Sequence, residues 1–424
     1  MGLKLKKPEK RAIKSAVIQY FLIVLVYIAH TPWFYVLSNA IYGAFCIGIT
    51  GISLAFMFFK KSTRERNLLP ILMLMLISSI FMEIIFSGFG GVSSAVYNIV
   101  QCAHTILIGV VAYKYDKENF ATRYVKIVFI LAIISLAFYV ACLVDYKYLI
   151  QAGILTKTNL NRLTFTNFYC NVFYALRERE VYRNCGMFSE PGLYQIVLVG
   201  ALYLLVFYSD QINLTHKNWM ILVLVFTIIT TGSGTGFIAL GLILIGVLFL
   251  PNNNINKHAR RVIGFTTAVI IILVFYDSLI HEDASFIDRM LIEKVLGISS
   301  SSITTGSVRY STITYMSSLI LHNPLGYGYT YVSNARMLNI PDSVGARLFV
   351  TIAAIGIIPV FALLYHFIRT SYRERLSNFQ FVILLCLYIN TTLAQSKEIY
   401  PIFAVLFIIE RSRRNIQTSI KSSN

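Results

Sequence analysis

Apolar segments of membrane-spanning length recur along the whole chain and alternate with short polar or basic connections. A helix of about 20 apolar residues crosses a hydrocarbon core of roughly 30 Å. The first, seventh, eighth, eleventh and twelfth segments are short or poorly separated, so we expect about ten to twelve crossings. The segments are 17–30, 37–59, 68–86, 94–113, 127–144, 191–208, 218–231, 235–250, 262–280, 345–368, 379–394 and 399–410. The pattern predicts an all-α, polytopic integral membrane protein with a single membrane domain over residues 1–424.

The composition agrees with a protein whose solvent is the bilayer. Hydrophobic residues make up 57% of the chain and charged residues 13%, about half the charged share of a soluble domain. The net charge of +18 is divided between the two sides of a membrane, so it does not indicate nucleic-acid binding. The basic segment Lys4–Lys14 precedes an apolar run without a small-residue cleavage site, which predicts an uncleaved first helix.

The basic residues are distributed unevenly between the two predicted sides. An N-terminus in the cytoplasm places most of the 37 basic residues in short cytoplasmic loops and tails, as the positive-inside rule requires. A group of arginines breaks this rule because it lies in two long loops on the opposite side. Its members are Arg162, Arg177, Arg179, Arg183, Arg289, Arg309 and Arg336. Their position indicates an anionic ligand outside the cytoplasm.

The two outer loops, 145–190 and 281–344, are much longer than a connection between neighbouring helices needs. In the first loop, aromatic and apolar residues from Phe165 to Leu176 recur at three- and four-residue spacing, which predicts a helix lying at the membrane interface. In the second loop, helices are predicted over 285–296 and 308–321. Asn323-Pro324 ends the latter helix, and the glycines of Leu325–Tyr329 allow a ligand to lie against a tight turn.

The string Arg183-Asn184-Cys185-Gly186-Met187-Phe188-Ser189-Glu190-Pro191-Gly192 joins the first loop to its transmembrane helix. A carboxylate at the membrane boundary beside an arginine is well placed for acid or base catalysis. The alternative is structural, because Glu190 precedes a proline at the first helical turn and is positioned to cap that helix.

The string Ser307-Val308-Arg309-Tyr310 precedes His322-Asn323-Pro324-Leu325-Gly326-Tyr327-Gly328. The planar guanidinium of Arg309 suits phosphate oxygens, although a snorkelling role at the lipid headgroups is the alternative. The imidazole of His322 is either a proton acceptor or a hydrogen-bonded structural group beside the end of a helix.

Other polar residues carry weaker signals. Glu83 lies within the third apolar segment, where it either serves a cavity or lies at the outer boundary. Cys170 and Cys185 share the first outer loop and either pair in an oxidising compartment or remain thiols. His281, Glu282 and Asp283 are adjacent in sequence and cannot easily converge on one ion, so no metal site is expected.

These two strings, in this order and with the Thr231-Gly232-Ser233-Gly234-Thr235-Gly236 break between helices, resemble the Wzy-type O-antigen and capsular polysaccharide polymerases. The topology of many helices and two large periplasmic loops is similar as well, and the expected architecture is GT-C-like. In residues, the resemblance rests on these short stretches alone.

The resemblance implies an inverting, metal-independent glycosyltransferase of the bacterial inner membrane with its active site facing the periplasm. Its substrates are undecaprenyl-pyrophosphate-linked glycans, no cofactor is expected, and membrane lipid and a chain-length regulator protein are the implied partners. Arginines hold the departing pyrophosphate, a role that we assign to Arg183 and Arg309, with Arg289 and Arg177 as further candidates. Glu190, followed by His322, is the expected base. The remaining substrate-loop candidates are Tyr310, Asn323, Gly326 and Gly328.

Two other functions fit parts of the pattern. The related O-antigen ligases share the architecture, transfer the same donor to lipid A core, and depend on a histidine in the second loop, which keeps His322 open as their base. A flippase or permease for the lipid-linked repeat unit usually has two similar halves and charge near the midplane. Here no internal repeat is visible, and the charge lies in unequal outer loops.

Overall fold

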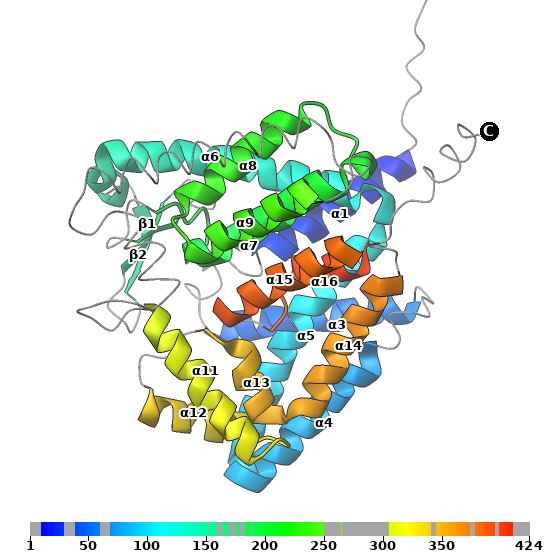
Figure 1. The fold of residues 1–424 in the computed structure, drawn as a ribbon, viewed down its shortest axis with the longest axis vertical. Coiled ribbons are helices and arrows are strands. Elements are labelled where there is room, and N and C mark those ends of the chain that lie inside the picture. Colours follow the sequence, from blue (N-terminus) through cyan, green and yellow to red (C-terminus); the bar gives the residue numbers. More distant parts are fainter. Residues whose placement is uncertain are drawn as a thin grey trace, which may run out of the picture.

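The computed structural model describes residues 10–28, 39–59, 68–151, 153–158, 164–168, 175–177, 183–188, 190–249, 264, 305–340, 345–373, 378–394 and 398–409. The described part is a bundle of packed helices with one small sheet at its side (Figure 1). The helices before the sheet are α1 (Lys10–Ile28), α3 (Asn39–Phe59), α4 (Leu68–Ser87), the 3-10 helix η2 (Phe89–Gly91), α5 (Val92–Tyr115) and α6 (Lys117–Gln151). Those after it are α7 (Pro191–Phe207), η5 (Ser209–Gln211), α8 (Lys217–Thr230), α9 (Gly234–Phe249), α11 (Thr305–His322), α12 (Tyr329–Asn339), α13 (Arg347–Ile355), α14 (Ile357–Arg373), α15 (Asn378–Ala394) and α16 (Pro401–Ile408).

Three stretches of helix within the described residues are long and apolar enough to cross a membrane. They are Leu68–Ser87, Phe89–Tyr115 and Lys117–Asp145, and seven shorter apolar helices accompany them. The exposed side chains of α4 include Phe81 and Ile85, as expected of a helix that faces lipid rather than water. These features are consistent with a helical membrane protein.

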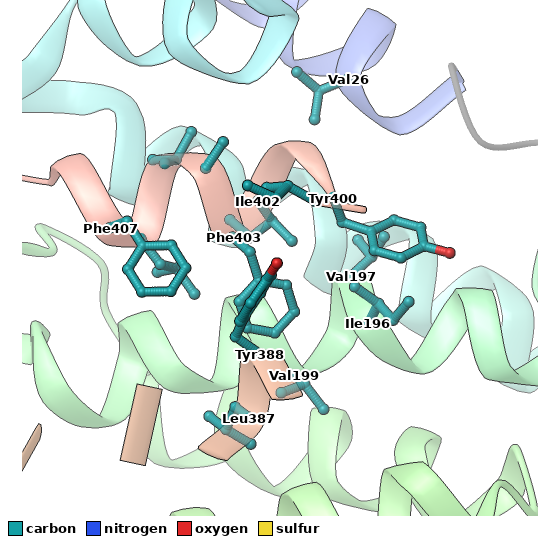
Figure 2. Packing of buried hydrophobic residues seen from close by; sticks show 14 of the residues in the cluster. Val26, Ile196, Val197, Val199, Leu387, Tyr388, Tyr400, Ile402, Phe403 and Phe407 are labelled. Atoms are coloured by element: carbon teal, nitrogen blue, oxygen red, sulfur yellow. The ribbon is translucent and has the colours of Figure 1, made fainter. Parts of the chain in front are cut away.

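The most enclosed parts of the core are α7, α16 and the C-terminal half of α5. Helix α5 packs against α1, α3, α4 and α16, and every residue of α16 is buried. Figure 2 shows Phe403 and Phe407 of α16 beside Tyr388 of α15, and the ring centroids of Tyr388 and Phe407 are 5.5 Å apart. A helix that is apolar all round requires such an environment, because it has no polar face to give to water.

Most predicted apolar segments correspond to helices of similar bounds, including the short seventh, eighth, eleventh and twelfth segments. The segment 345–368, however, is not one helix. It divides into α13 and α14 at Gly356, which has φ +90°. The Ile357 amide, which a continuous helix would engage internally, instead donates to the carbonyl oxygen of Pro324 at 2.9 Å.

The prediction of an interfacial helix over Phe165–Leu176 is wrong, although the rest of the described chain is helical as predicted. The structure has three antiparallel strands in the first loop: β1 (Gly153–Thr158), β2 (Thr164–Phe168) and β3 (Ala175–Arg177). Threonines face each other across the first pair, with Thr156 opposite Thr166 and Thr158 opposite Thr164. Such β-branched pairs favour a pleated ladder, which outweighed the helical spacing of the aromatic residues.

The second loop is mostly helical where it is described. The predicted helix over 308–321 is confirmed as α11, whereas α12 was not predicted at all. In Figure 1, α11, α12 and α13 gather beside α4, away from the helices α6 to α9. The predicted helix over 285–296 and nearly all of the segment 262–280 lie outside the described residues.

Candidate functional site

The segment between the first loop and α7 is fixed to the end of α8 by a buried asparagine. The Asn184 amide donates to the carbonyl oxygen of Thr230 at 2.8 Å. Its side-chain nitrogen donates to the hydroxyls of Ser135 and Thr230 at 3.2 and 3.1 Å, and its side-chain oxygen accepts from the Gly186 amide at 2.9 Å. The first motif and the Thr231–Gly236 break are therefore one structural unit, although the sequence separates them.

Arg183 and Glu190 stand at the two ends of this segment. The Arg183 Nε donates to the carbonyl oxygen of Thr231 at 3.1 Å, which holds the guanidinium beside the break between α8 and α9. Glu190 is the N-cap residue of α7, with Pro191 in the first turn, but its side chain makes no capping hydrogen bond. The position predicted by the structural alternative is confirmed, while capping by the carboxylate is not observed. The Glu190 carboxylate makes no hydrogen bond with the described part of the chain.

His322 lies at the C-terminal end of α11 and is exposed. Its Nδ1 lies 2.7 Å from the carbonyl oxygen of Ser318, so the tautomer that donates from Nδ1 satisfies this contact and leaves Nε2 as an acceptor. The following turn is closed by Asn323, whose side-chain nitrogen donates to the Gly326 carbonyl oxygen at 2.6 Å. Two backbone bonds dock the turn on α13, from the Tyr327 amide to Ala353 and from the Gly328 amide to Ala354, both at 2.9 Å.

The length of α11 separates two of the predicted site residues. Arg309 lies near its start and His322 at its end, so their backbones are about 20 Å apart along the axis. Tyr310 is 73% exposed, and the Arg309 side chain is outside the described part of the structure. One pyrophosphate group is too small to contact both ends of this helix. The predicted residues of the second loop therefore do not form one compact site.

A different cluster of polar groups lies between α12 and α13. The Arg347 Nε donates to Oε1 of Glu398 at 2.9 Å, and its terminal nitrogen donates to Asn98 on α5. The hydroxyl of Thr351 donates to the same Glu398 oxygen at 2.6 Å. The Arg347 guanidinium also lies over the ring of Tyr329, 5.2 Å from its centroid. Both charged side chains are largely buried, with exposed fractions of 20% for Arg347 and 4% for Glu398.

Arg336 adds a second guanidinium to this cluster. It follows Tyr329 and Val332 at a spacing that places all three on one face of α12, and the first two are buried there. Burial, and then the charge of the neighbouring Arg347, lower the pKa of Arg336 from its usual value. Among the described residues, Arg336 has no carboxylate partner and no side-chain hydrogen bond. Glu398 therefore neutralises Arg347, while Arg336 contributes a partly buried positive charge that no carboxylate among the described residues offsets.

Arg347 and Glu398 were missed as site residues, although the sequence carried a signal for them. Arg347 is a charge within the predicted apolar segment 345–368, and Glu398 lies immediately before the last one. Intramembrane or boundary charges of this kind are rarely tolerated without a partner. Pairing the two would have required knowing that α13 and the start of α16 meet.

The predicted site residues thus lie in three places: Arg309 and Tyr310 near the start of α11, and the two groups that follow. Arg183 and Glu190 lie beside the α8–α9 break, whereas His322, Asn323, Gly326 and Gly328 belong to the turn on α13. Arg289 and the side chain of Arg177 lie outside the described residues, as does Cys170. Cys185 is buried, and its thiol donates to the Arg183 carbonyl oxygen at 3.7 Å. Because Cys170 lies outside the described residues, the two alternatives, a disulfide or two thiols, both stay predictions.

No group of three histidine, cysteine, aspartate or glutamate side chains is placed to hold a metal ion among the described residues. Comparison of the chain with protein-family models, with curated proteins and with solved structures finds no match. The functional assignment therefore depends on the residues and their geometry.

Proposed function

We propose that this protein is a polysaccharide polymerase that transfers an undecaprenyl-pyrophosphate-linked glycan onto a lipid-linked repeat unit at the periplasmic face of the bacterial inner membrane. The reaction is inverting and needs no metal. In it, a hydroxyl oxygen of the acceptor sugar attacks the anomeric carbon of the donor. The bond from that carbon to the pyrophosphate oxygen breaks, the pyrophosphate leaves with the electron pair, and a protein base takes the hydroxyl proton.

The observation that supports this proposal most strongly is the partly buried guanidinium of Arg336 beside Arg347. Placing like charges together in a poorly solvated site is unfavourable unless an anion neutralises them when the protein works. Arginine is the residue suited to phosphate oxygens, because its planar fork donates two parallel hydrogen bonds. A pyrophosphate leaving group needs such charge stabilisation more than it needs protonation.

Arg183 and Arg309 remain candidates for the same role. The hydrogen bond from Arg183 Nε to the Thr231 carbonyl oxygen fixes the side chain beside the break between α8 and α9. Arg183→Ala and Arg309→Ala should leave the protein inserted but abolish long polymer, and lysine at either position should restore it only in part, since it offers a point charge without the fork. Full-length polymer on a silver-stained gel from either alanine variant contradicts the assignment of that residue.

The base is Glu190 or His322, and the structure defines a variant for each. Purified protein in liposomes with lipid-linked repeat units measures polymer formation directly. Glu190→Gln keeps the shape of a side chain that makes no capping bond, so a loss of turnover with donor binding retained assigns the base to Glu190. Unchanged turnover in Glu190→Gln, together with a loss in His322→Gln, moves the role to His322. Normal turnover in both variants excludes both residues.

A second candidate function is ligation of the glycan to lipid A core. It is favoured by the contact of His322 Nδ1 with the Ser318 carbonyl oxygen, since the tautomer that donates from Nδ1 keeps Nε2 as an acceptor on this exposed residue of the second loop. The two functions differ only in the acceptor. Supplying lipid-linked repeat units in one reaction and lipid A core in another separates them, because a polymerase lengthens the former and a ligase modifies the latter.

A further inference from the structure

Glu83 is a carboxylate buried within a candidate membrane-spanning helix. It lies in α4, one turn before the helix ends at Ser87, and its exposed fraction is 0%. Both carboxylate oxygens accept from the Thr330 amide, at 3.1 and 3.3 Å. The carboxylate thus meets the first turn of α12, where backbone N–H groups have no partner within the helix and the dipole favours negative charge. Glu83 is therefore a buried, hydrogen-bonded carboxyl group near the end of α4 rather than a solvent-exposed side chain.

The Glu83 carboxylate fits between two segments of backbone because the residues that approach it, Gly91 and Gly328, have no side chain. A Cβ atom added to Gly91, in η2, would lie 2.2 Å from the Glu83 Oε1, and one added to Gly328 would lie 2.9 Å from Oε2. Both distances are shorter than any normal carbon–oxygen contact. Glu83 is therefore enclosed from two sides by chain segments that are more than 200 residues apart in the sequence.

The same region joins α4 to the turn that carries His322. The ring of Phe86, the next exposed aromatic residue of α4, lies 5.1 Å from Tyr327 and 5.9 Å from Tyr331. Ser78 of α4 donates to the carbonyl oxygen of Ile355 at 2.6 Å, so α4 also contacts the end of α13, on which the turn is docked. The carboxyl group of Glu83 lies at the centre of this contact.

We propose that Glu83 is a positioning residue that fixes the start of α12 and thereby sets the placement of both His322 and Arg336. His322 lies before the turn that ends at Gly328, and Arg336 lies on α12, whose first turn the carboxylate holds. A hydrogen bond from a backbone amide to a charged acceptor is stronger than a neutral one. The functional half of this inference rests on the proposed glycosyl transfer, whereas the structural half, the attachment of α12 by Glu83, does not.

The test replaces the carboxylate and, separately, crowds it. In Glu83→Gln the side chain keeps its size but loses the charge and one acceptor oxygen. In Gly91→Ala the new methyl group displaces the carboxylate while Glu83 itself is unchanged. The matched controls are Gly51→Ala, where no atom lies within 4 Å of the new Cβ, and Glu118→Gln, which removes an exposed carboxylate on α6.

The first measurement is amide hydrogen exchange of the protein in nanodiscs. We expect exchange to accelerate at least about tenfold in peptides covering 323–332 in both test variants, with unchanged exchange in α5 and α16 and in both controls. Unchanged exchange at 323–332 overturns the attachment. A variant that exchanges faster throughout has lost its fold, in which case Gly91→Ala and the milder Glu83→Asp decide the question by the same readout.

The second measurement is the kinetics of polymer formation. If Glu83 positions the site, kcat falls about tenfold or more in Glu83→Gln, while KM for the lipid-linked repeat unit changes less than about threefold. Accelerated exchange with normal kcat limits Glu83 to a structural role and overturns the functional half. If the wild-type protein forms no polymer under any condition, the proposed function fails, and the exchange result still decides whether Glu83 holds α12.

Discussion

Arg336 and Arg347 are chemically identical residues that the structure places in opposite situations. Arg347 is paired with Glu398, and removing it leaves a buried carboxylate without its cation. Arg336 has no such partner among the described residues, and burial, followed by the charge of Arg347, lowers its pKa. Selection for stability alone gives no reason to keep a partly buried arginine without a carboxylate partner, whereas selection for anion binding does.

Replacing each arginine by methionine tests this difference. Arg347→Met should lower the free energy of unfolding by about 3 kcal/mol because Glu398 stays buried and unpaired. Arg336→Met should leave stability unchanged or raise it by about 1 kcal/mol, while abolishing polymer formation. Thermal unfolding in detergent, with polymer measured on the same samples, checks both. A strongly destabilised Arg336→Met protein means that Arg336 has a structural partner, and the inferred anion site is then wrong.

Asn184 is the residue on which the geometry of the first motif depends. It is fully buried, and its side chain makes three hydrogen bonds, two of them to the buried groups of Ser135 and Gly186 and one to the half-buried Thr230. Asn184→Ala should reduce the free energy of unfolding by about 2–3 kcal/mol, since buried partners are left unsatisfied. The exposed Asn119→Ala serves as control and should change it by less than about 0.5 kcal/mol. Equal melting temperatures for the two variants would show that the segment is held by other contacts.

At the scale of elements, the turn after α11 and the break between α13 and α14 stabilise each other. Three backbone hydrogen bonds join them: those donated by Tyr327 and Gly328 to α13, and that donated by Ile357 to Pro324. Each segment therefore provides hydrogen-bond partners for backbone groups of the other segment that have no partner within their own helix or turn. The turn is therefore a rigid feature of the fold rather than an independent loop.

Gly326→Ala tests this coupling. Gly326 has φ +101°, and an added Cβ would lie 2.6 Å from the Ala354 carbonyl oxygen, so the turn must separate from α13. We expect faster amide exchange at 323–328 and at 352–357 together, with polymer formation reduced at least about tenfold. Gly241→Ala, in an open part of α9, is the control and should be neutral or slightly stabilising. Acceleration confined to the turn itself would contradict the coupling.

The elements also show what could be predicted from the sequence. Hydropathy predicted most helices well, because burial in lipid or core demands apolar residues whatever their partners are. It missed the break at Gly356, since Ile355, Ile357 and Ile358 keep the segment apolar on both sides of it. It also missed α12, whose sequence has little apolar character and whose position depends on Glu83 and on contacts with α13. The pairing of Arg347 with Glu398 could not be predicted from the sequence, because it depends on how distant segments meet in the tertiary structure.

At the scale of the whole molecule, the proposed function requires that α12 and the adjoining end of α4, near Ser87, face the periplasm. The charge distribution predicts this side for the loop 281–344 and the opposite side for the connection after α5. One exposed residue marks each side. Asn334 on α12 is predicted to lie on the periplasmic side, and Glu118 at the start of α6 on the cytoplasmic side.

Single cysteines at these two positions test the orientation. In a background with the six native cysteines replaced, Asn334→Cys should react with a membrane-impermeant maleimide in intact spheroplasts. Glu118→Cys should react only after the membrane is permeabilised. The reverse pattern would place Arg336 and Arg347 on the cytoplasmic side, where a periplasmic polymerase cannot use them.

The most direct test of the central claim is the binding of undecaprenyl pyrophosphate to the purified protein in nanodiscs, measured for the wild type, Arg336→Gln and Arg183→Gln. If the outer arginines hold a diphosphate, the wild type binds it, at least one of the two variants binds it about tenfold or more weakly, and the corresponding lysine variant is intermediate. The same affinity in the wild type and both glutamine variants would contradict the account.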